Sequence, residues 1–377
     1  MEKVYKPKNS IYSLIQLISL TLVLSTSQSS EIISRFQHYL QINTAQPNPD
    51  YTSATNFILS QSKALNLESQ TIEFVKGKPV ILLKWIGKYP KLPSILLNSH
   101  TDVVPVEQHK WTHPPFNAHI DEVGHIYARG SQDMKCVGLQ YLEAIRALKD
   151  RGFEPVRTVY VSFVPDEEIG GHDGAEKFAQ SEVFEKMNVG IVLDEGLASP
   201  NENYRVFYGE SRSRIIEKRI AEEWAPSSRN MTFQLGQFKQ KGSVHDKSEK
   251  PALTAADMSN PWWVLLEEAV KKANRKLDKP EVFPASTDAR YFRERGLPAI
   301  GFSPMANTPV LLHDHNEFLN KAEYLKGVEI YESIIKDYAS YIEKPSGDRP
   351  RKSCKSSIAL AHVQDIVFSF SIVCVVL

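Results

Sequence analysis

The feature that most constrains the fold is a repeated alternation of short apolar runs with segments of helical period. The apolar runs have the length and composition of buried strands, and they cover Val80–Trp85, Ser94–Asn98, Thr158–Val164 and Val189–Leu193. Strands that alternate with helices build a mainly parallel, right-handed sheet with helices on its faces. The sequence therefore predicts an α/β fold with a mainly parallel twisted sheet flanked by helices.

Weaker patterns predict the remaining elements. Helices are expected at Glu31–Ile42, Thr52–Leu67, Asp133 to about Lys149, a segment ending near Gln180, Ser286–Glu294 and Ala322–Tyr341. Further strands are expected at Thr71–Val75, His125–Ala128, Val206–Tyr208, Glu281–Phe283 and Ala299–Phe302. One more helix is expected to run through Lys276, with Ser259 as its N-cap and Pro261 near its first turn.

Length and composition narrow the class of protein. A chain of 377 residues is long enough for two domains, and 42% apolar with 24% charged residues is ordinary for a soluble protein. The formal net charge is zero, which argues against nucleic acid as the main partner because that partner favours a basic excess. Three cysteines without close spacing cannot form a disulfide framework.

The two ends of the chain differ from the rest. Lys3, Lys6 and Lys8 precede an apolar stretch at residues 11–24, and small residues follow it. This order is typical of a secretory signal peptide, which would place the protein in the secretory pathway or outside the cell. An uncleaved anchor and a plain extension of a cytoplasmic protein are the alternatives. The apolar residues 366–377 are about half as many as a membrane-spanning helix needs, so we expect no other membrane contact.

Polar residues follow the predicted buried strands at the points where these strands end. They are His100, Asp102, Asp133, Glu167, Glu168, Asp194 and Glu195, with His313 later in the chain. The carboxyl ends of parallel strands meet at one edge of a sheet, where α/β proteins bind their ligands. So many acids would repel one another and be costly to bury, and bound cations resolve that conflict. Imidazoles combined with carboxylates suit zinc, and a surplus carboxylate suits a general base.

Each of these residues also has an ordinary structural interpretation. Taken alone, His100 resembles a hydrogen-bonded core histidine, and Asp133 resembles a helix N-cap. Glu167 and Glu168 resemble a solvated first helical turn, and His313 with His315 resembles a loop pair. Their joint occurrence in this order favours a metal site.

Five motifs carry a resemblance to a known family. They are SHTDVVP at 99–105, YARGSQDMK at 127–135, VPDEEIGG at 164–171, LDEG at 193–196 and TPVLLHDHNE at 308–317. In this order they resemble the co-catalytic zinc metallopeptidases, a family of aminoacylases, carboxypeptidases and dipeptidases. SNPWW at 259–263 and GFSPM at 301–305 are most similar to the eukaryotic aminoacylases. The likeness covers about residues 31–209 and 215–344.

The resemblance implies a zinc-exopeptidase-like fold and a site for two zinc ions in each chain. His100 and Glu195 would bind the first zinc, and Glu168 and His313 would bind the second. Asp133 would bridge both ions.

The resemblance also implies the reaction and the residues that support it. The substrate would be an N-acyl-L-amino acid, split into a carboxylate and a free amino acid. Asp102 would orient His100 through a hydrogen bond, and Glu167 would act as general base. Arg290 and Thr287 are predicted to hold the substrate carboxylate; for Arg290 the alternative is a surface ion pair.

One region departs from the family pattern. The family has a separate lid and dimerisation domain after Gly209, with a histidine that stabilises the oxyanion, and this chain has only a predicted helix at Ile215–Trp224 and a strand at Met231–Leu235. The predicted divisions are 1–30 signal peptide or extension, 31–209 and 259–344 catalytic domain, 210–258 truncated α+β lid and linker, and 345–377 atypical tail. We expect impaired hydrolysis and a largely missing homodimer surface. A dipeptidase or carboxypeptidase, and an inactive zinc-binding isoform that associates with a full-length sibling, are the alternatives.

Overall fold

A computed structural model describes residues 27–210 and 253–343, and its centre is an eight-stranded sheet. In spatial order its strands are β1 (Glu68–Val75), β2 (Lys78–Trp85), β6 (Val159–Val164), β3 (Ser94–His100), β7 (Val189–Asp194), β10 (Ala299–Phe302), β8 (Val206–Glu210) and β9 (Glu281–Phe283). The central strands β6, β3, β7 and β10 are parallel neighbours. The predicted α/β fold with a mainly parallel sheet is confirmed. Within this eight-stranded sheet, antiparallel pairing is confined to β1–β2, β2–β6 and β8–β10.

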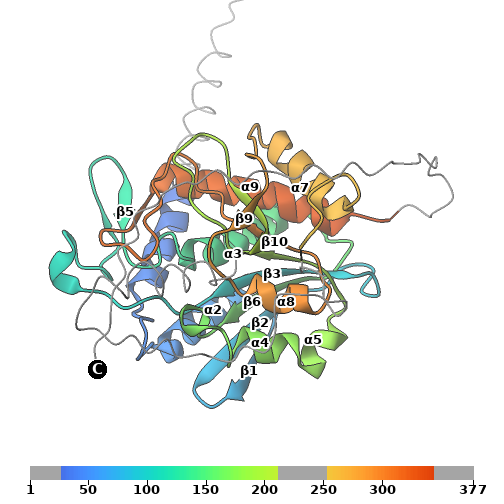
Figure 1. Cartoon of the computed structure of the whole chain (residues 1–377), viewed down its shortest axis with the longest axis horizontal. Helices are drawn as coiled ribbons and strands as arrows, with labels where there is room; N and C mark the ends of the chain where they lie inside the picture. The colour runs from blue at the N-terminus through green and yellow to red at the C-terminus, as the bar shows by residue number, and fades with distance from the viewer. Residues whose placement is uncertain (1–26, 211–252, 344–377) are drawn as a thin grey trace, which may run out of the picture.

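Helices cover both faces of this sheet (Figure 1). One face carries α3 (Lys135–Asp150), α7 (Pro261–Lys272) and α9 (Lys321–Ser340), and the other carries α4 (Ala175–Ala179), α5 (Glu182–Lys186) and α8 (Ala289–Glu294). A helix over residues 27–41 and α2 (Tyr51–Ala64) add side chains to the first core.

The central strands have no polar face because both of their faces are covered. In β3, Ile95 and Leu97 belong to the core under α3 and α9, whereas Leu96 belongs to the core under α4, α5 and α8. Every residue of β3 is buried. Strands buried on both faces appear in a sequence as continuous apolar runs, which is why these strands could be predicted from the sequence.

Helix boundaries show where the local prediction was wrong. Asn260, and not Ser259, is the N-cap of α7, because the Asn260 side chain accepts a hydrogen bond from the backbone N–H of Trp262. The Ser259 hydroxyl instead donates to Asp257. The helix ends at Lys272 and not at Lys276, since Asn274 takes a left-handed conformation with φ of 57°.

A second, three-stranded sheet has the order β11 (Phe318–Asn320), β5 (His125–Tyr127) and β4 (His119–Ile120). We expected Asp133 at the edge of the main sheet because it follows the strand at 125–128. Asp133 does lie at that edge, 3.1 Å from His100 at the end of β3, but the reason was wrong, since β5 pairs with β4 and β11 and not with the main sheet. Asp133 therefore reaches the site on the loop between β5 and α3.

The main sheet fixes the two chain ends that border the gap between residues 210 and 253. The first described segment ends at Glu210, whose carboxylate pairs with Arg293 at 2.8 Å, both side chains being buried. The second begins at residue 253, and the Thr254 N–H donates to the Tyr208 carbonyl at 2.8 Å. The Thr254 hydroxyl also donates to the carbonyl of Ala299 on β10 at 2.7 Å. Both ends of the interruption are thereby fixed to neighbouring strands.

Several predictions fall on residues outside the described ranges. They concern the N-terminal signal segment up to residue 26, the helix and strand at 215–224 and 231–235, and the tail from 344. They stay predictions. No helix within 27–210 and 253–343 combines the length and apolar character that a membrane crossing requires.

The burial of β3 leads to a stability prediction. Replacing Ile95, which is 0% exposed, by alanine should lower the free energy of unfolding by about 2–5 kcal/mol, because it removes packed apolar surface and leaves a cavity. The matched change Ile342→Ala, at a site that is 55% exposed, should cost less than about 0.5 kcal/mol. Urea denaturation of both variants measures the difference, and equal losses would contradict the assigned core.

Candidate metal centre

Adjacent parallel strands bring the predicted residues to one edge of the main sheet. His100 is the last residue of β3, and Glu195 directly follows β7. Glu167 and Glu168 begin a short 3-10 helix shortly after β6. Because β3 lies between β6 and β7 with all three parallel, their carboxyl ends lie side by side. The sheet thus positions four of the predicted site residues.

Asp133 lies between the two predicted histidine ligands. Its Oδ1 is 3.1 Å from Nε2 of His100, and its Oδ2 is 3.1 Å from Nε2 of His313. Nε2 of His100 is also 3.7 Å from Glu195, and Nε2 of His313 is 2.9 Å from Glu168. The structure therefore brings all five predicted ligands together, with Asp133 common to both halves.

Two groups of side chains in the described residues are able to hold a metal ion. They are His100, Asp133 and Glu195, and Asp133, Glu168 and His313, and within each group the ligand atoms lie within 4.8 Å of one another. Each group offers one imidazole nitrogen and two carboxylates. Nitrogen and oxygen donors in this proportion suit zinc and similar divalent ions.

The pKa values of the cluster show how burial and neighbouring charges act on its acids and on His313. Burial raises the pKa of Glu195 well above its usual range, and the nearby charge of Asp133 adds to the rise. Burial and Asp133 raise the pKa of Glu168 in the same way. Burial acts to lower the pKa of His313, but its contacts with Asp133 and Glu168 outweigh burial and raise it to about 11. Burial thus disfavours the charged forms of Glu168 and Glu195, and a bound metal ion would offset that cost.

An unsatisfied atom supports the same conclusion. Oε1 of Glu168 is buried and has no hydrogen-bond partner in the part of the chain that the structure describes. A buried carboxylate oxygen without a partner is costly, and a metal ion would satisfy it. The residues present therefore fit metal ions.

Asp102 contacts more than His100. The His100 ring Nδ1 lies 2.9 Å from the Asp102 backbone carbonyl and 3.5 Å from its carboxylate. The carboxylate accepts hydrogen bonds from the backbone N–H groups of Glu167 at 3.1 Å and Glu168 at 3.3 Å. It also accepts one from the Gln46 side chain at 2.8 Å. Asp102 therefore fixes the turn that carries both glutamates as well as lying against His100.

Glu167 differs from its neighbour. The Glu168 carboxylate contacts His313, whereas the Glu167 carboxylate forms no hydrogen bond or ion pair within 27–210 and 253–343. Burial raises the pKa of Glu167 well above its usual range, and the charges of Asp288 and Glu168 add to the rise. Glu167 is thus an acid beside the metal-binding groups that none of them uses.

The two predicted substrate-binding residues come from α8 and the residues just before it. Arg290 is only 7% exposed, and it forms no ion pair with the residues that the structure describes. Its guanidinium donates to the carbonyl of Gly170 at 2.6 Å, and its Nε has no partner among the described residues. The Thr287 hydroxyl donates to Glu210 at 2.8 Å, so Thr287 holds the end of β8. Of these two residues, only Arg290 has a donor, its Nε, without a partner among the described residues.

Sequence reasoning missed three residues that support the site. Gln46 binds Asp102, and Gln132 and Glu317 bind the loops that carry Asp133 and His313. Glu317 ends the motif TPVLLHDHNE, and Gln132 lies within YARGSQDMK. Their positions in these motifs could have indicated a role for Gln132 and Glu317, although only Asp133 and His313 of these motifs were interpreted as ligands.

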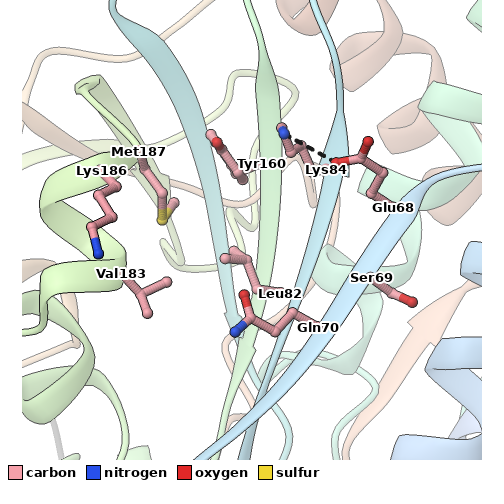
Figure 2. A pocket seen from close by; sticks show the side chains of 9 residues that line it. All are labelled: Glu68, Ser69, Gln70, Leu82, Lys84, Tyr160, Val183, Lys186 and Met187. Atoms are coloured by element: carbon pink, nitrogen blue, oxygen red, sulfur yellow. Dashed lines mark ion pairs between the residues drawn. The ribbon is translucent and has the colours of Figure 1, made fainter.

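The described residues also border a surface hollow of about 510 Å³ (Figure 2). It is bordered by α5 and by strands β1, β2 and β6, and the ion pair between Lys84 and Glu68 spans 3.0 Å at its edge. Tyr160 in its lining is near the amino end of β6, whereas Glu167 and Glu168 follow the carboxyl end of that strand. None of the predicted site residues lines this hollow.

Comparison with known proteins agrees with this geometry. The family model for peptidase family M20/M25/M40 matches residues 96–337, a range that includes every predicted metal ligand. The chain belongs to this peptidase family. It is 40% identical to aminoacylase-1 of Mus musculus over 389 residues, which cover 82% of this chain and 95% of the mouse protein. It is 38% identical to aminoacylase-1 of Homo sapiens over 395 residues, which cover 83% of this chain and 97% of the human protein. The chain is a homologue of aminoacylase-1.

Solved structures share the fold at much lower identity. Human carnosine dipeptidase 1 aligns with a TM-score of 0.62 at 12% identity, over 83% of this chain and 98% of that protein. An M20 family metallo-carboxypeptidase from Sulfolobus solfataricus aligns with a TM-score of 0.63 at 16% identity, over 82% of this chain and 99% of that protein. At these identities the likeness concerns the fold alone.

The alignment with the mouse protein is longer than the part of this chain that it covers. It spans 389 residues, whereas 82% of 377 residues is about 309. About 80 aligned positions, the difference between these lengths, therefore have no residue of this chain.

The shared position of Asp133 leads to a prediction about metal content. Asp133→Ala should bring the bound metal, measured by inductively coupled plasma mass spectrometry, from about two ions per chain to nearly none, because both groups lose a ligand. Asp150→Ala, an exposed aspartate at the end of α3, should keep the original content. Retention of both ions by the Asp133 variant would exclude the proposed centre.

Proposed function

We propose that this chain is a zinc-dependent amidohydrolase that splits N-acyl-L-amino acids into a carboxylate and a free L-amino acid. The observation that carries the proposal is an unengaged acid, Glu167, beside two metal-binding groups that share Asp133. A hydrolytic site needs such an acid as general base. Homology to aminoacylase-1 supports the substrate class.

The ligand assignment follows the two groups. His100 and Glu195 would bind the first zinc ion, Glu168 and His313 the second, and Asp133 both. Two zinc ions, when bound, would activate a water molecule as nucleophile and polarise the amide carbonyl.

The protein's own groups would move the proton and hold the substrate. Glu167 would accept the proton of the attacking water on a carboxylate oxygen and deliver it to the nitrogen of the leaving amino acid. Asp102 would keep Glu167 in place through its backbone N–H. Arg290, with a buried Nε that has no partner in the described ranges, would bind the substrate carboxylate.

We also propose that turnover is impaired. About 80 positions of aminoacylase-1 have no counterpart here, and the only histidine between Asp173 and His313 is His245. The family resemblance implies that a lid histidine stabilises the oxyanion, and losing one such donor commonly costs about 100- to 1000-fold in turnover. The same loss would remove most of the dimer surface.

Hydrolysis of N-acetyl-L-methionine by the zinc-loaded chain tests the proposal. Release of free amine should be zinc-dependent and about 100- to 1000-fold slower than with mouse aminoacylase-1 measured in parallel. A chimera with the missing mouse segment inserted after Glu210 should recover much of the difference. Equal rates for this chain and the mouse enzyme would contradict the impairment.

The same assay separates the competing functions. Faster release from unmodified dipeptides than from N-acyl amino acids would favour a dipeptidase or carboxypeptidase. Full zinc content without hydrolysis of any substrate, together with co-purification of a longer sibling, would favour an inactive partner isoform.

The role of Glu167 leads to a specific mutational prediction. Glu167→Gln should lower kcat by about 10²–10⁴-fold relative to the unmodified chain, because the amide cannot accept the proton. Its zinc content should stay unchanged, since Glu167 belongs to neither metal-binding group. Glu182→Gln, at an exposed position on α5, is the control and should keep both activity and zinc. Loss of zinc from the Glu167 variant would assign this residue to the metal instead.

A further inference from the structure

Two of the five proposed ligands lie in loops that no adjacent strand of the main sheet positions. Asp133 lies between β5 and α3, and His313 lies in the segment between β10 and β11. The His313 side chain is 52% exposed and its backbone is left-handed, with φ of 62°. Nevertheless, Nε2 of His313 is 3.1 Å from Asp133. Some interaction must hold these two loops at this separation.

One half of that interaction is the carboxylate of Glu317. Its Oε1 accepts hydrogen bonds from the backbone N–H groups of Gln132 at 2.6 Å and Asp133 at 3.3 Å. Its Oε2 accepts one from the Gly130 N–H at 3.2 Å and pairs with Arg129 at 2.7 Å. Glu317 on the His313 loop therefore fixes the backbone of the Asp133 loop.

The other half is the carboxamide of Gln132. Its Nε2 donates to the carbonyls of Pro309 at 3.0 Å and Phe318 at 2.7 Å. Its Oε1 accepts from the N–H of Leu311 at 3.0 Å. Gln132 on the Asp133 loop therefore fixes the backbone of the His313 loop, on both sides of His313 itself.

Burial makes this reciprocal arrangement strong. Gln132 is 3% exposed and Glu317 is 0% exposed. Removal of either side chain would leave buried backbone groups of the opposite loop without partners, which costs more than the lost bonds alone. The loops are thereby held in one relative position.

We infer that Gln132 is a positioning residue for the second metal ion, acting through the Gln132–Glu317 clasp on the loop that carries His313. The inference rests on the proposed two-metal site and deepens it. The contacts of the Gln132 side chain lie on the His313 loop, and His313 belongs to only one of the two metal-binding groups. Loss of this side chain would therefore weaken one metal site more than the other.

Zinc titration of Gln132→Met provides the test, because methionine keeps the length of the side chain and removes its hydrogen bonds. Competition with a chromophoric chelator should show two zinc ions bound by the unmodified chain. In the variant, the second ion should bind about 10- to 100-fold more weakly, as is typical when groups that support metal ligands are changed. The first ion should bind within about twofold of its original affinity. Gln132→Asn, which keeps the amide on a shorter side chain, should give a smaller loss of the same kind and serves if the methionine variant does not fold.

Gln140→Met is the matched control. Gln140 on α3 is another buried glutamine, and its side chain donates to the Tyr324 carbonyl on α9 at 2.9 Å, which belongs to neither of the two loops. It should lower the melting temperature and leave both zinc affinities intact. Equal weakening of both ions in Gln132→Met, or the same selective loss in Gln140→Met, would overturn the inference. An unmodified chain that binds fewer than two zinc ions would overturn the proposed site as well, whereas two ions bound unchanged by the Gln132 variants would overturn the clasp alone.

Discussion

The centre of this protein depends on one electrostatic conflict, the burial of several acids at the same edge of a sheet. Asp133, Glu168 and Glu195 lie close enough to share two imidazoles, those of His100 and His313. Burial and the nearby charge of Asp133 raise the pKa values of Glu168 and Glu195. Positive charge between the acids relieves this conflict, and metal ions held by the two metal-binding groups would supply it.

The main sheet and the loops contribute differently to this arrangement. Strands β6, β3 and β7 are buried on both faces, so the positions of their carboxyl ends are set by the two cores. Their residues, including His100 and Glu195, need little else to hold them. Asp133 and His313 have no strand of that sheet behind them, and polar contacts of Gln132 and Glu317 take over the task. Rigid packing and a hydrogen-bonded clasp thereby share one site.

Much of the fold and about half of the site could be predicted from residue patterns alone. Apolar runs revealed β3 and β7, and the polar residues after them led to His100 and Glu195. The same pattern also listed Asp133 and His313, but only the family resemblance assigned the five residues to two metal ions, because loop position follows no periodic pattern. The contacts of Gln132 and Glu317 are mostly to backbone groups, which any sequence supplies and no pattern marks. The cap of α7 failed because Ser259 and Asn260 are both good caps, and only local geometry selects between them.

The fixed positions of residues 210 and 253 affect how the protein tolerates insertions and deletions between them. The buried pair of Glu210 and Arg293 anchors the exit, and the contacts of Thr254 with Tyr208 and Ala299 anchor the return on neighbouring strands. Since both junctions are tied to the sheet, the length of what lies between them puts little load on the core. An insertion or deletion between residues 210 and 253 should therefore change the stability of the sheet only little. The sheet can thus keep its structure through changes in the length of the sequence between its two fixed points.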